Sequence, residues 1–487
     1  MKNGVIMQYF EWNVPNDGRF WRKLKKDALH LTRIGITAVW IPPACKAISA
    51  KDVGYGIYDL FDLGEFYQKR SLRTKYGTKA ELKRAIATLH KYNISVYFDA
   101  VMNHKAGADY TEEFVVKEVD PTNRNHFISE SYTIGGWTGF YFGGRNNQYS
   151  DFKWNKNHFT GVDYNVKNGK KAIYLIQGDN KEWSDNVDTE NGNYDYLMYA
   201  NIDYKNTTVV EHMKEWGIWI SKELKLNGMR LDAVKHIDSN FAGEFTTAIR
   251  REKGKFFYFV GEYWKNDVES LIKYVEETKG QIDLFDVPLH YNLHEASEME
   301  GNYDLRNIFN NTFVKVHPEL AVTFVENHDS QIGSALESYV RDWFKPLAYG
   351  LILLMKEGYP CVFYGDYYSM GYYKSHHKHI IDVLLKTRQV YAHGEQIDYF
   401  DNPSVVGFVR LGEENHPSSG LAFLISNQYE ESKTMYVGKN RAGEIWQEIT
   451  GNVKETVIID SDGNGDFHVK GKSLAAWVQR RQRAKKH

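Results

Sequence analysis

Eight short apolar runs recur along the first 370 residues, and most of them end in polar residues. Runs without a strict alternation of apolar and polar residues are typical of parallel strands that are buried on both faces. They begin at Gly4, Ala38, Ser95, Gly228, Phe256, Asp283, Ala321 and Gly358. Segments with helical periodicity separate them, and eight strands that alternate with helices predict a (β/α)8 TIM barrel.

Two of the intervening segments indicate where helices begin and end. Thr78 and Glu81 have the spacing of a capping box, which predicts a helix that follows Thr78. The segment from Val209 onward has a helical pattern and closes with Asn227 and Gly228, a usual helix ending. Both segments fit the helices that the barrel requires between its strands.

The spacing of the apolar runs is uneven, which predicts additions to the barrel. A long segment rich in Asn, Asp, Gly, Tyr and Trp separates the third run from the fourth. We expect residues 103–206 to form an irregular, β-rich domain, inserted between the third strand and the third helix of the barrel. Short alternating segments predict an all-β sandwich domain over residues 396–487. The catalytic barrel then comprises residues 1–102 and 207–395.

The composition is that of an ordinary soluble protein. Of the 487 residues, 42 % are hydrophobic and 25 % are charged, and the net charge of −2 favours neither nucleic acid nor an acidic membrane as a partner. Cys45 and Cys361 are too few for a disulfide framework. No secretory signal is visible, and no run approaches the ~18 apolar residues of a membrane span. We therefore expect a cytoplasmic monomer, unless a leader was removed, with a solvated basic tail at residues 480–487.

Ionisable residues are concentrated where the predicted strands end. In a barrel of this type the catalytic groups lie at the C-terminal ends of the strands. The residues at these ends are Asp99, Asn103 and His104 on the third strand, Arg230, Asp232, Lys235 and His236 on the fourth, Glu262 and Trp264 on the fifth, and Asn327, His328 and Asp329 on the seventh. Three carboxylates, Asp232, Glu262 and Asp329, are therefore expected to face one cavity.

Two carboxylates that face one site are what glycoside hydrolysis requires, one as nucleophile and one as proton donor. Arg230 lies on the same strand face as Asp232, and its charge should keep that carboxylate ionised. Glu262 stands among apolar and aromatic residues, which should raise its pKa towards that of a working acid. The alternative is a set of structural ion pairs at the barrel rim. It is disfavoured because four strand ends each place a charge that a purely structural barrel could avoid.

Four segments resemble the signature sequences of the α-amylase family, glycoside hydrolase family 13, and occur in the family's order. They are DAVMNH, GMRLDAVKH, GEYW and FVENHD. The likeness extends to VGYGIYDLFDLGEF, WFKPLAYG and MYVGKNRAGEIW, and it is closest to bacterial liquefying α-amylases and their cytoplasmic relatives. This resemblance implies that Asp232 is the nucleophile, that Glu262 is the general acid/base, and that Asp329 is the third carboxylate, which grips the distorted sugar.

The resemblance also implies the residues that contact the substrate. Tyr55 would stack under the sugar ring, and its place between two glycines in a loop favours this role over a core position. The subsite of the nucleophile would be lined by His104, Arg230 and His328. The leaving-group side would be contacted by Lys235, His236 and Trp264.

A calcium site between the barrel and the inserted segment is a further implication of the resemblance. The positions that hold the first ion in the liquefying relatives carry Asn103, Asp195, Asn201 and the backbone carbonyl of His236. Those relatives usually have Asp at the Asn201 position. We therefore expect one weakened site that can hold calcium, with sodium as a substitute.

The rest of the metal cluster of those relatives is expected to be absent. Thr160, Ser184 and Lys205 occupy positions where the relatives commonly carry Asp. Calcium affinity depends on how many charged oxygens converge on the ion, so these changes should empty the extended calcium–sodium–calcium cluster. Asp203 survives and is expected to be a structural hydrogen-bonding residue. The sequence HHKH at residues 376–379 is interpreted as a solvated helix start and not as a metal site.

The function that these features predict is that of a retaining, endo-acting α-amylase. It would hydrolyse internal α-1,4-glucosidic bonds in starch, glycogen or maltodextrins through a covalent glycosyl-enzyme intermediate. One alternative is a maltooligosaccharide-forming exo-amylase or a transglycosylase on the same site, because loops set the product. Another is a carbohydrate-binding barrel without catalysis, but such proteins usually lack part of the carboxylate set that is present here.

Overall fold

In the computed structural model, which describes residues 3–371 and 373–480, eight parallel strands close into a barrel. Successive neighbours around the barrel are β1 (Ile6–Gln8), β2 (Ala38–Ile41), β5 (Ser95–Ala100), β13 (Gly228–Leu231), β14 (Tyr258–Gly261), β15 (Asp283–Phe285), β16 (Ala321–Phe324) and β17 (Tyr359–Phe363), which pairs with β1 again. Each strand lies within one of the eight apolar runs. The predicted (β/α)8 barrel is therefore confirmed.

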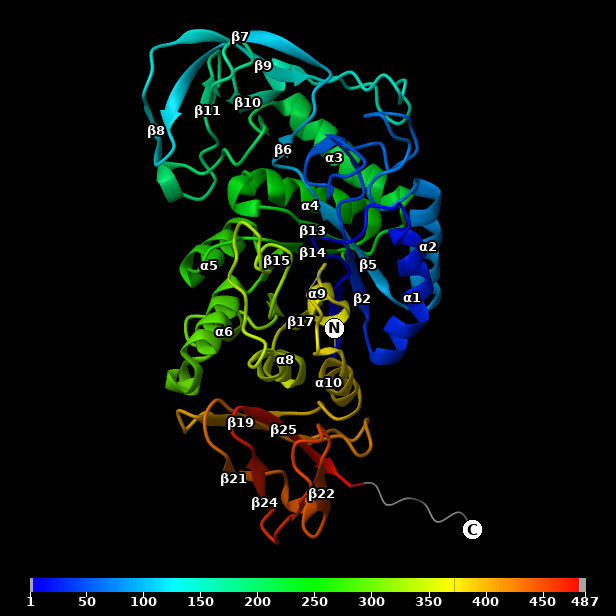
Figure 1. Ribbon diagram of the computed structural model, residues 1–487, viewed down its shortest axis with the longest axis vertical. Coiled ribbons are helices and arrows are strands. Elements are labelled where there is room, and N and C mark those ends of the chain that lie inside the picture. The colour runs from blue at the N-terminus through cyan, green and yellow to red at the C-terminus, as the bar shows by residue number, and fades with distance from the viewer. Residues whose placement is uncertain (1–2, 372, 481–487) are drawn as a thin grey trace.

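Helices surround the barrel (Figure 1). The longer ones are α1 (Phe20–Ile34), α2 (Lys79–Lys91), α3 (Thr207–Glu223), α4 (Ser239–Lys253), α5 (Val268–Glu277), α6 (Val287–Met299), α8 (Lys345–Leu354) and α10 (Lys378–Val390). Two short helices, α7 and α9, span Phe313–Val316 and Tyr364–Tyr368. The predicted capping box of α2 is present, because Thr78 and the N3 residue Glu81 bond to each other's backbone N–H.

The end of α3 differs from the prediction. The helix stops at Glu223, before Asn227 and Gly228, because Lys225 adopts a left-handed φ of 53° that a helix cannot continue through. Asn227 instead accepts a hydrogen bond of 2.9 Å from the backbone N–H of Val96 on β5. Gly228 opens β13, where a Cβ atom would lie 2.5 Å from the carbonyl oxygen of Tyr258. The glycine is required by close strand packing and not by a helix cap.

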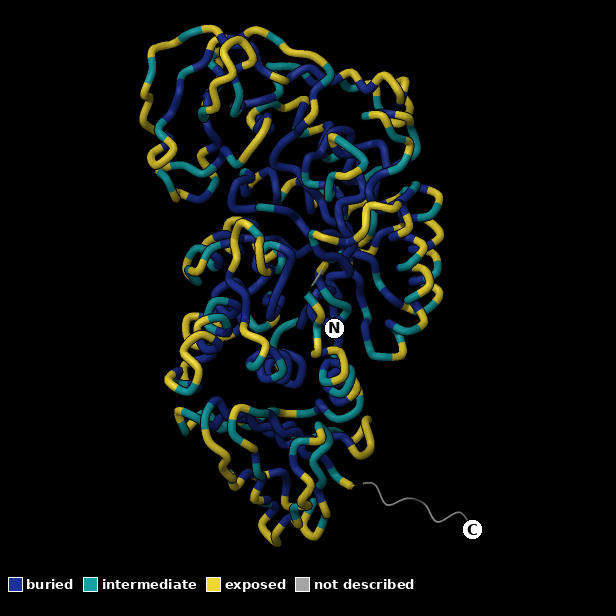
Figure 2. Tube along the Cα trace, in the orientation of Figure 1, coloured by how far each residue is buried: buried dark blue, intermediate teal, exposed yellow. Residues whose placement is uncertain are grey.

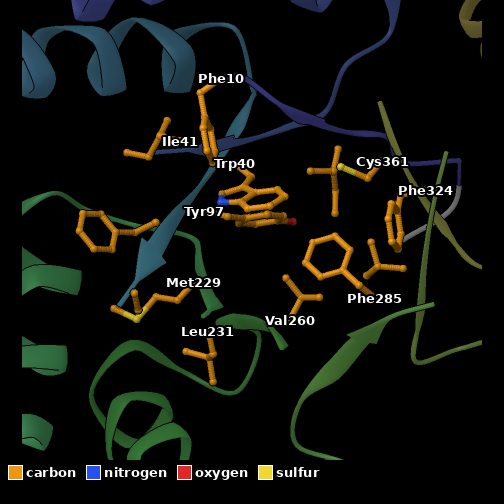
Figure 3. Packing of buried hydrophobic residues seen from close by; sticks show 14 of the residues in the cluster. Phe10, Trp40, Ile41, Tyr97, Met229, Leu231, Val260, Phe285, Phe324 and Cys361 are labelled. Atoms are coloured by element: carbon orange, nitrogen blue, oxygen red, sulfur yellow. The ribbon is translucent and has the colours of Figure 1, made fainter. Parts of the chain in front are cut away.

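Aromatic side chains fill the barrel beneath its C-terminal end. Figure 3 shows Trp40 among these residues, and its ring lies 5.3 Å from both Phe10 and Phe285. Burial of each such side chain contributes about 1.5–3 kcal/mol to folding. Trp40 also donates from Nε1 to Asp99 Oδ2 at 3.0 Å, and the Arg230 guanidinium lies 5.0 Å from its ring. The core thereby supports the charged groups above it.

A second, seven-stranded sheet lies beside the C-terminal end of the barrel, at the top of Figure 1. Its strands are β6 (His104–Lys105), β7 (Tyr110–Asp120), β8 (Asn123–Phe127), β9 (Tyr132–Gly139), β10 (Phe159–Tyr164), β11 (Lys171–Ile176) and β12 (Ala200–Ile202). The sheet joins the barrel directly, because β6 follows β5 after three residues and pairs with β12. It lies in the segment where the sequence predicts a β-rich insertion.

The C-terminal part is all β, as predicted, and packs at the opposite end of the molecule (Figure 1). A six-stranded sheet contains β18 (Gln396–Tyr399), β19 (Val405–Arg410), β20 (Leu421–Ser426), β25 (Ser473–Gln479), β22 (Ile445–Glu448) and β23 (Thr456–Ile458). A second sheet pairs β21 (Glu431–Tyr436) with β24 (Asn464–Val469). Figure 2 shows the buried strands of this part. The predicted basic tail lies, after Arg480, outside the described residues.

No helix in the described part of the chain is long and apolar enough to span a bilayer. Both cysteines, Cys45 and Cys361, are buried and free.

Candidate active site

Arg230 is at the centre of the charged cluster, and its side chain is fully buried. Its Nη1 donates to Asp99 Oδ1 at 2.7 Å and to Asp232 Oδ1 at 2.6 Å. Its Nη2 lies 2.8 Å from Glu262 Oε2, an ion pair without hydrogen-bond geometry. The sequence predicts only the pairing with Asp232. The structure shows that one guanidinium contacts both Asp232 and Glu262.

A sharp turn after β13 brings Asp232 and Glu262 together. Asp232 follows the last strand residue, and its backbone N–H is held by the carbonyl oxygen of Ala100 at 3.1 Å. The next residue, Ala233, has a φ of 49°, a left-handed conformation that costs an alanine roughly 1–2 kcal/mol. In this conformation its N–H donates to Glu262 Oε2 at 3.1 Å. The strained residue therefore fixes the Glu262 carboxylate.

The surroundings of Glu262 shift the pKa of its carboxyl group upward. Burial raises its pKa above that of an ordinary glutamate, and the Asp232 charge raises it further, while Arg230 opposes both effects. This direction agrees with the expectation from its apolar sequence neighbours. A raised pKa favours the protonated form, which is the form that protonates a leaving oxygen.

Asp329 enters the site from the loop after β16. The side-chain oxygen of Asn327 accepts from the backbone N–H groups of Asp329, at 2.8 Å, and Ser330, at 2.9 Å, which closes the loop into a tight turn. Burial and the Glu262 charge raise the pKa of Asp329 well above its usual value. The Asp329 side chain is 22 % exposed, so part of it remains accessible to a ligand.

A buried ion network beneath this loop was not predicted. Glu326 accepts from Ser330 Oγ and from the backbone N–H of Val340 at 3.1 Å. Lys345, on α8, lies 3.2 Å from Glu326 and also pairs with Asp366. Glu326 is the third residue of the FVENHD segment, but no local signal identifies Lys345 as its partner.

Tyr55 and His328 form a pair beside Asp99 and Asp329. Their rings are stacked at 5.3 Å with an angle of 13°, and the Tyr55 hydroxyl lies 2.9 Å from Asp99 Oδ2 and 2.7 Å from His328 Nε2. Gln8, on β1, donates from Nε2 to His328 Nδ1 at 3.0 Å. His328 therefore carries its proton on Nε2 and donates it to the tyrosine hydroxyl. Burial and Arg230 lower the pKa of His328 well below its usual value, so the ring is neutral.

His104 lies next to this pair, on β6. Its Nε2 is 2.8 Å from the carbonyl oxygen of Tyr55, which ties the tyrosine loop to the barrel. Gln8 and Asp99 are the residues of this side that the sequence did not propose as ligand contacts. Asp99 was named among the strand-end residues but without a role, whereas Gln8 lies within an apolar run without a distinguishing signal.

The residues predicted for the leaving-group side lie on the 3-10 turn Val234–His236 and after β14. Lys235 Nζ donates to the carbonyl oxygen of Trp264 and to Glu190 Oε2, both at 3.0 Å. His236 Nδ1 donates to the carbonyl oxygen of Tyr194 at 2.7 Å. Burial and the Lys235 charge lower the pKa of His236 to about 3, so this ring is neutral. Glu190 and Tyr194 come from the inserted segment and were not predicted.

The four residues proposed for a calcium ion are adjacent in the structure. Asn103 Nδ2 donates to the carbonyl oxygens of His236 at 3.0 Å and Asp195 at 3.3 Å. Asn201 Oδ1 is buried and has no hydrogen-bond partner. The Asp195 carboxylate accepts from the Ser184 backbone N–H at 3.2 Å, and burial raises its pKa to about 7. An orphaned amide oxygen beside a buried carboxylate is an arrangement that suits a hard cation.

Asp203, the acidic residue of the expected metal cluster that is retained in this sequence, is paired with a lysine. Lys181 Nζ pairs with Asp203 and donates to the carbonyl oxygens of Phe159 at 3.0 Å and Asn157 at 2.8 Å. Lys205, which the sequence places at a position where the relatives commonly carry Asp, pairs instead with the exposed carboxylates of Glu182 and Asp185. The lysine 22 residues before Asp203 reaches it instead.

Comparisons with known proteins agree with this architecture. Residues 26–396 match the family model "Alpha amylase, catalytic domain", and residues 421–478 match "Alpha-amylase C-terminal". The chain is 51 % identical over 482 residues to the glucan 1,4-alpha-maltohexaosidase of Bacillus sp. (strain 707), covering 98 % of this chain and 93 % of that protein.

Two further relatives carry the name alpha-amylase. The alpha-amylase of Bacillus licheniformis is 51 % identical over 482 residues, covering 98 % of this chain and 94 % of that protein. The cytoplasmic alpha-amylase of Escherichia coli (strain K12) is 41 % identical over 492 residues, covering 98 % of this chain and 99 % of that protein. The similarity to these two proteins therefore extends over the barrel, the inserted sheet and the C-terminal sheets.

Proposed function

The chain belongs to the α-amylase family, glycoside hydrolase family 13, and we propose that Asp232, Glu262 and Asp329 are the residues with which it cleaves α-1,4-glucans. It is a glycoside hydrolase, and retention with endo action is consistent with its family. The observation that carries the assignment is Arg230, which contacts Asp232 at 2.6 Å and Glu262 at 2.8 Å within one buried cluster.

The proposed reaction has two steps. Asp232 attacks the anomeric carbon and forms a carbon–oxygen bond, while Glu262 gives its proton to the glycosidic oxygen as the old bond breaks. Water then attacks the glycosyl-enzyme, and Glu262 takes a proton from that water as Asp232 departs. Arg230 stabilises the carboxylate form of Asp232 in both steps. Asp329 would bind sugar hydroxyls through its accessible side, next to the Tyr55 and His328 pair.

A long glucan chain is the proposed substrate, bound along the inserted domain, residues 103–206. A cavity of about 410 Å³ lies there, lined by Trp137, Tyr199 and Ile48 among others. Tyr199 is 5.5 Å from the ring of His104, so the cavity adjoins the proposed catalytic subsite. Trp137 is 46 % exposed, which leaves its face free to stack on a sugar ring. Binding surface beyond one subsite favours internal cleavage.

A second candidate is a maltooligosaccharide-forming exo-amylase. It is favoured by one observation: two relatives with the same 51 % identity carry different names, glucan 1,4-alpha-maltohexaosidase and alpha-amylase. A product time course separates the two. Endo action should release colour from a dyed, cross-linked starch before much short sugar appears. One oligosaccharide that dominates from the first minutes would instead support the exo-enzyme.

The assignment of the catalytic residues is tested with two isosteric variants. Asp232→Asn should lose nearly all turnover, and Glu262→Gln should lose turnover on natural glucans but retain it on substrates whose leaving group needs no proton. NMR of the first product should show the α-anomer. If Asp232→Asn keeps a tenth or more of the wild-type turnover, Asp232 is not the nucleophile. Glu269→Gln, which alters an exposed carboxylate on helix α5 outside the site, is the control and should remain active.

We further propose that Asn103, Asp195, Asn201 and the carbonyl of His236 bind one calcium ion, or sodium in its place. The ion would supply the positive charge that the buried Asp195 carboxylate lacks and would join the barrel to the inserted domain. We also propose that Lys181, paired with Asp203, takes the place of the extended cluster.

We propose a cytoplasmic location. Both cysteines are free thiols, and the Escherichia coli relative is named cytoplasmic alpha-amylase. The monomeric state remains a prediction, which light scattering on the purified chain can test.

A further inference from the structure

A buried carboxylate joins the inserted segment to the strand end that carries Glu262. Asp188 lies between β11 and β12, and its side chain is only 2 % exposed. Its Oδ2 is 2.9 Å from the ammonium group of Lys265, which lies just after β14. The Tyr263 hydroxyl donates to the same oxygen at 2.5 Å. One carboxylate of the inserted segment therefore binds two side chains that follow Glu262 in the sequence.

Asp188 also fixes its own loop and a turn of the barrel. Its Oδ1 accepts from the backbone N–H of Glu190 at 2.8 Å. Its backbone N–H donates to the carbonyl oxygen of Lys235 at 3.0 Å. Burial alone would raise the pKa of Asp188, but the hydrogen bonds from Tyr263 and Lys265 more than offset this effect, so the pKa lies below its usual value. Asp188 is therefore an anion that is tied to both neighbouring segments.

These contacts surround the place where a departing glucan chain must lie. A general acid has to reach the leaving oxygen at roughly 2.6–3.2 Å, so the departing chain passes next to the Glu262 carboxyl group. The backbone N–H of Val234 donates to the carbonyl oxygen of Glu262 at 3.0 Å, which places the next residue, Lys235, beside this group. Lys235 Nζ donates in turn to Glu190 Oε2 and to the carbonyl oxygen of Trp264, both at 3.0 Å. The Glu190 side chain is 44 % exposed, so its carboxylate is accessible to a sugar hydroxyl.

We propose that Asp188 is a positioning residue for the leaving-group side of the site, an inference that rests on the proposed function. Through Tyr263 and Lys265 it holds the inserted segment against the residues that follow β14. Glu190 and Lys235 are thereby kept at fixed positions, where they can bond the hydroxyl groups of the sugars that leave. Asp188 itself does not touch the substrate, because its carboxylate is buried and bonded to its protein partners.

The expected effect of losing Asp188 is weaker binding of the departing chain, with the chemical step unchanged. A contact that is equally strong in the ground state and in the transition state changes KM and not kcat. Weaker contacts on the leaving-group side also favour binding modes in which fewer sugars occupy that side. The reducing end of a glucan departs with the leaving oxygen, so the cleaved bond should move towards the reducing end.

The test compares Asp188→Asn and Lys265→Met with wild type on two substrates. On maltohexaose, each variant should raise KM about two- to tenfold, the value of one hydrogen bond, and leave kcat unchanged. Maltohexaose labelled at its reducing end should give a shorter labelled product. The release of 4-nitrophenol from 4-nitrophenyl maltotrioside, a leaving group without sugar, should keep the wild-type kcat/KM. The double variant should be no worse than either single variant, because both changes remove the same ion pair.

Lys273→Met is the matched control. Lys273 lines the same small cavity of about 110 Å³ as Asp188 and Lys265, but it pairs with Glu277 at 3.7 Å, and its loss should change neither substrate. Lys265 is 28 % exposed, so Lys265→Met should fold even if Asp188→Asn does not. All rates are measured well below the lowest melting temperature of the set.

Three results would overturn the inference. A fall in kcat on maltohexaose, or an equal loss on both substrates, would show that the change disturbs the whole site. Variants that match wild type on both substrates and cleave the same bond would show that the ion pair has no part in binding. Asp232→Asn, measured in parallel, separates these results from a failure of the proposed function. If Asp232→Asn stays active, the catalytic assignment itself is wrong; if it is inactive while Asp188→Asn matches wild type, only the positioning role is wrong.

Discussion

Replacement of Lys181 by methionine tests whether a lysine has taken the place of metal ions between the barrel and the inserted domain. The Lys181 and Asp203 side chains are 11 % and 4 % exposed, so their ion pair is almost completely buried. Methionine keeps the length and the apolar stem but removes the charge. Asp203 then remains buried without a cation, and the carbonyl oxygen of Phe159 loses the bond from Lys181.

Loss of one partner of a buried ion pair costs about 3–5 kcal/mol, because the other charge stays desolvated. We expect Lys181→Met to lower the free energy of unfolding by this amount. Lys205→Met is the matched control, because Lys205 pairs with Glu182 and Asp185, which are 78 % and 82 % exposed. An exposed pair contributes about 0–1 kcal/mol, so this variant should be nearly as stable as wild type.

The assay is urea unfolding followed by tryptophan fluorescence and by residual activity, with and without calcium. Calcium should restore part of the stability of Lys181→Met, because the freed Asp203 carboxylate and the nearby carbonyl oxygens are ligands for it. It should not affect Lys205→Met beyond its effect on wild type. If the two variants lose the same stability, Lys181 does not act as an internal cation and the reasoning is refuted.

Three further predictions concern pH, metal and substrate length. Lys235→Met removes a positive charge that lowers the pKa of Glu262. The alkaline limb of the pH profile of kcat/KM should therefore move to higher pH. If this limb does not move, Glu262 is not the group that titrates there. Excess EDTA should lower the melting temperature of wild type only slightly and leave most activity, whereas a full inactivation that calcium reverses would indicate a strong site. Trp137→Ala should reduce kcat/KM on long glucans about two- to tenfold, because one stacking contact is lost. Cleavage of maltotriose should be unchanged. An equal loss on both substrates would show that Trp137 does not belong to the chain-binding surface.

The sequence by itself was sufficient for the barrel and for the clustering of the three carboxylates. Parallel buried strands have a local signature, and the carboxyl ends of such strands meet at one end of a barrel whatever their exact register. The direction of the Glu262 pKa also followed from its neighbours along the chain, because the strand that buries it is adjacent in sequence. These features depend on short-range pattern and on topology alone.

The partners of individual charges were decided by the tertiary structure. Arg230 was expected to pair with Asp232 alone. The pairing of β13 with β14 also places Glu262 next to the Nη2 atom of Arg230. Lys181 rather than Lys205 reaches Asp203, and His393 meets Glu413 and His416 across a domain junction. Long side chains can reach several partners, and only the packing of distant segments selects among them. Composition and spacing can therefore locate a charged site, but the identity of each ion pair depends on how far apart the folded backbone holds the two segments.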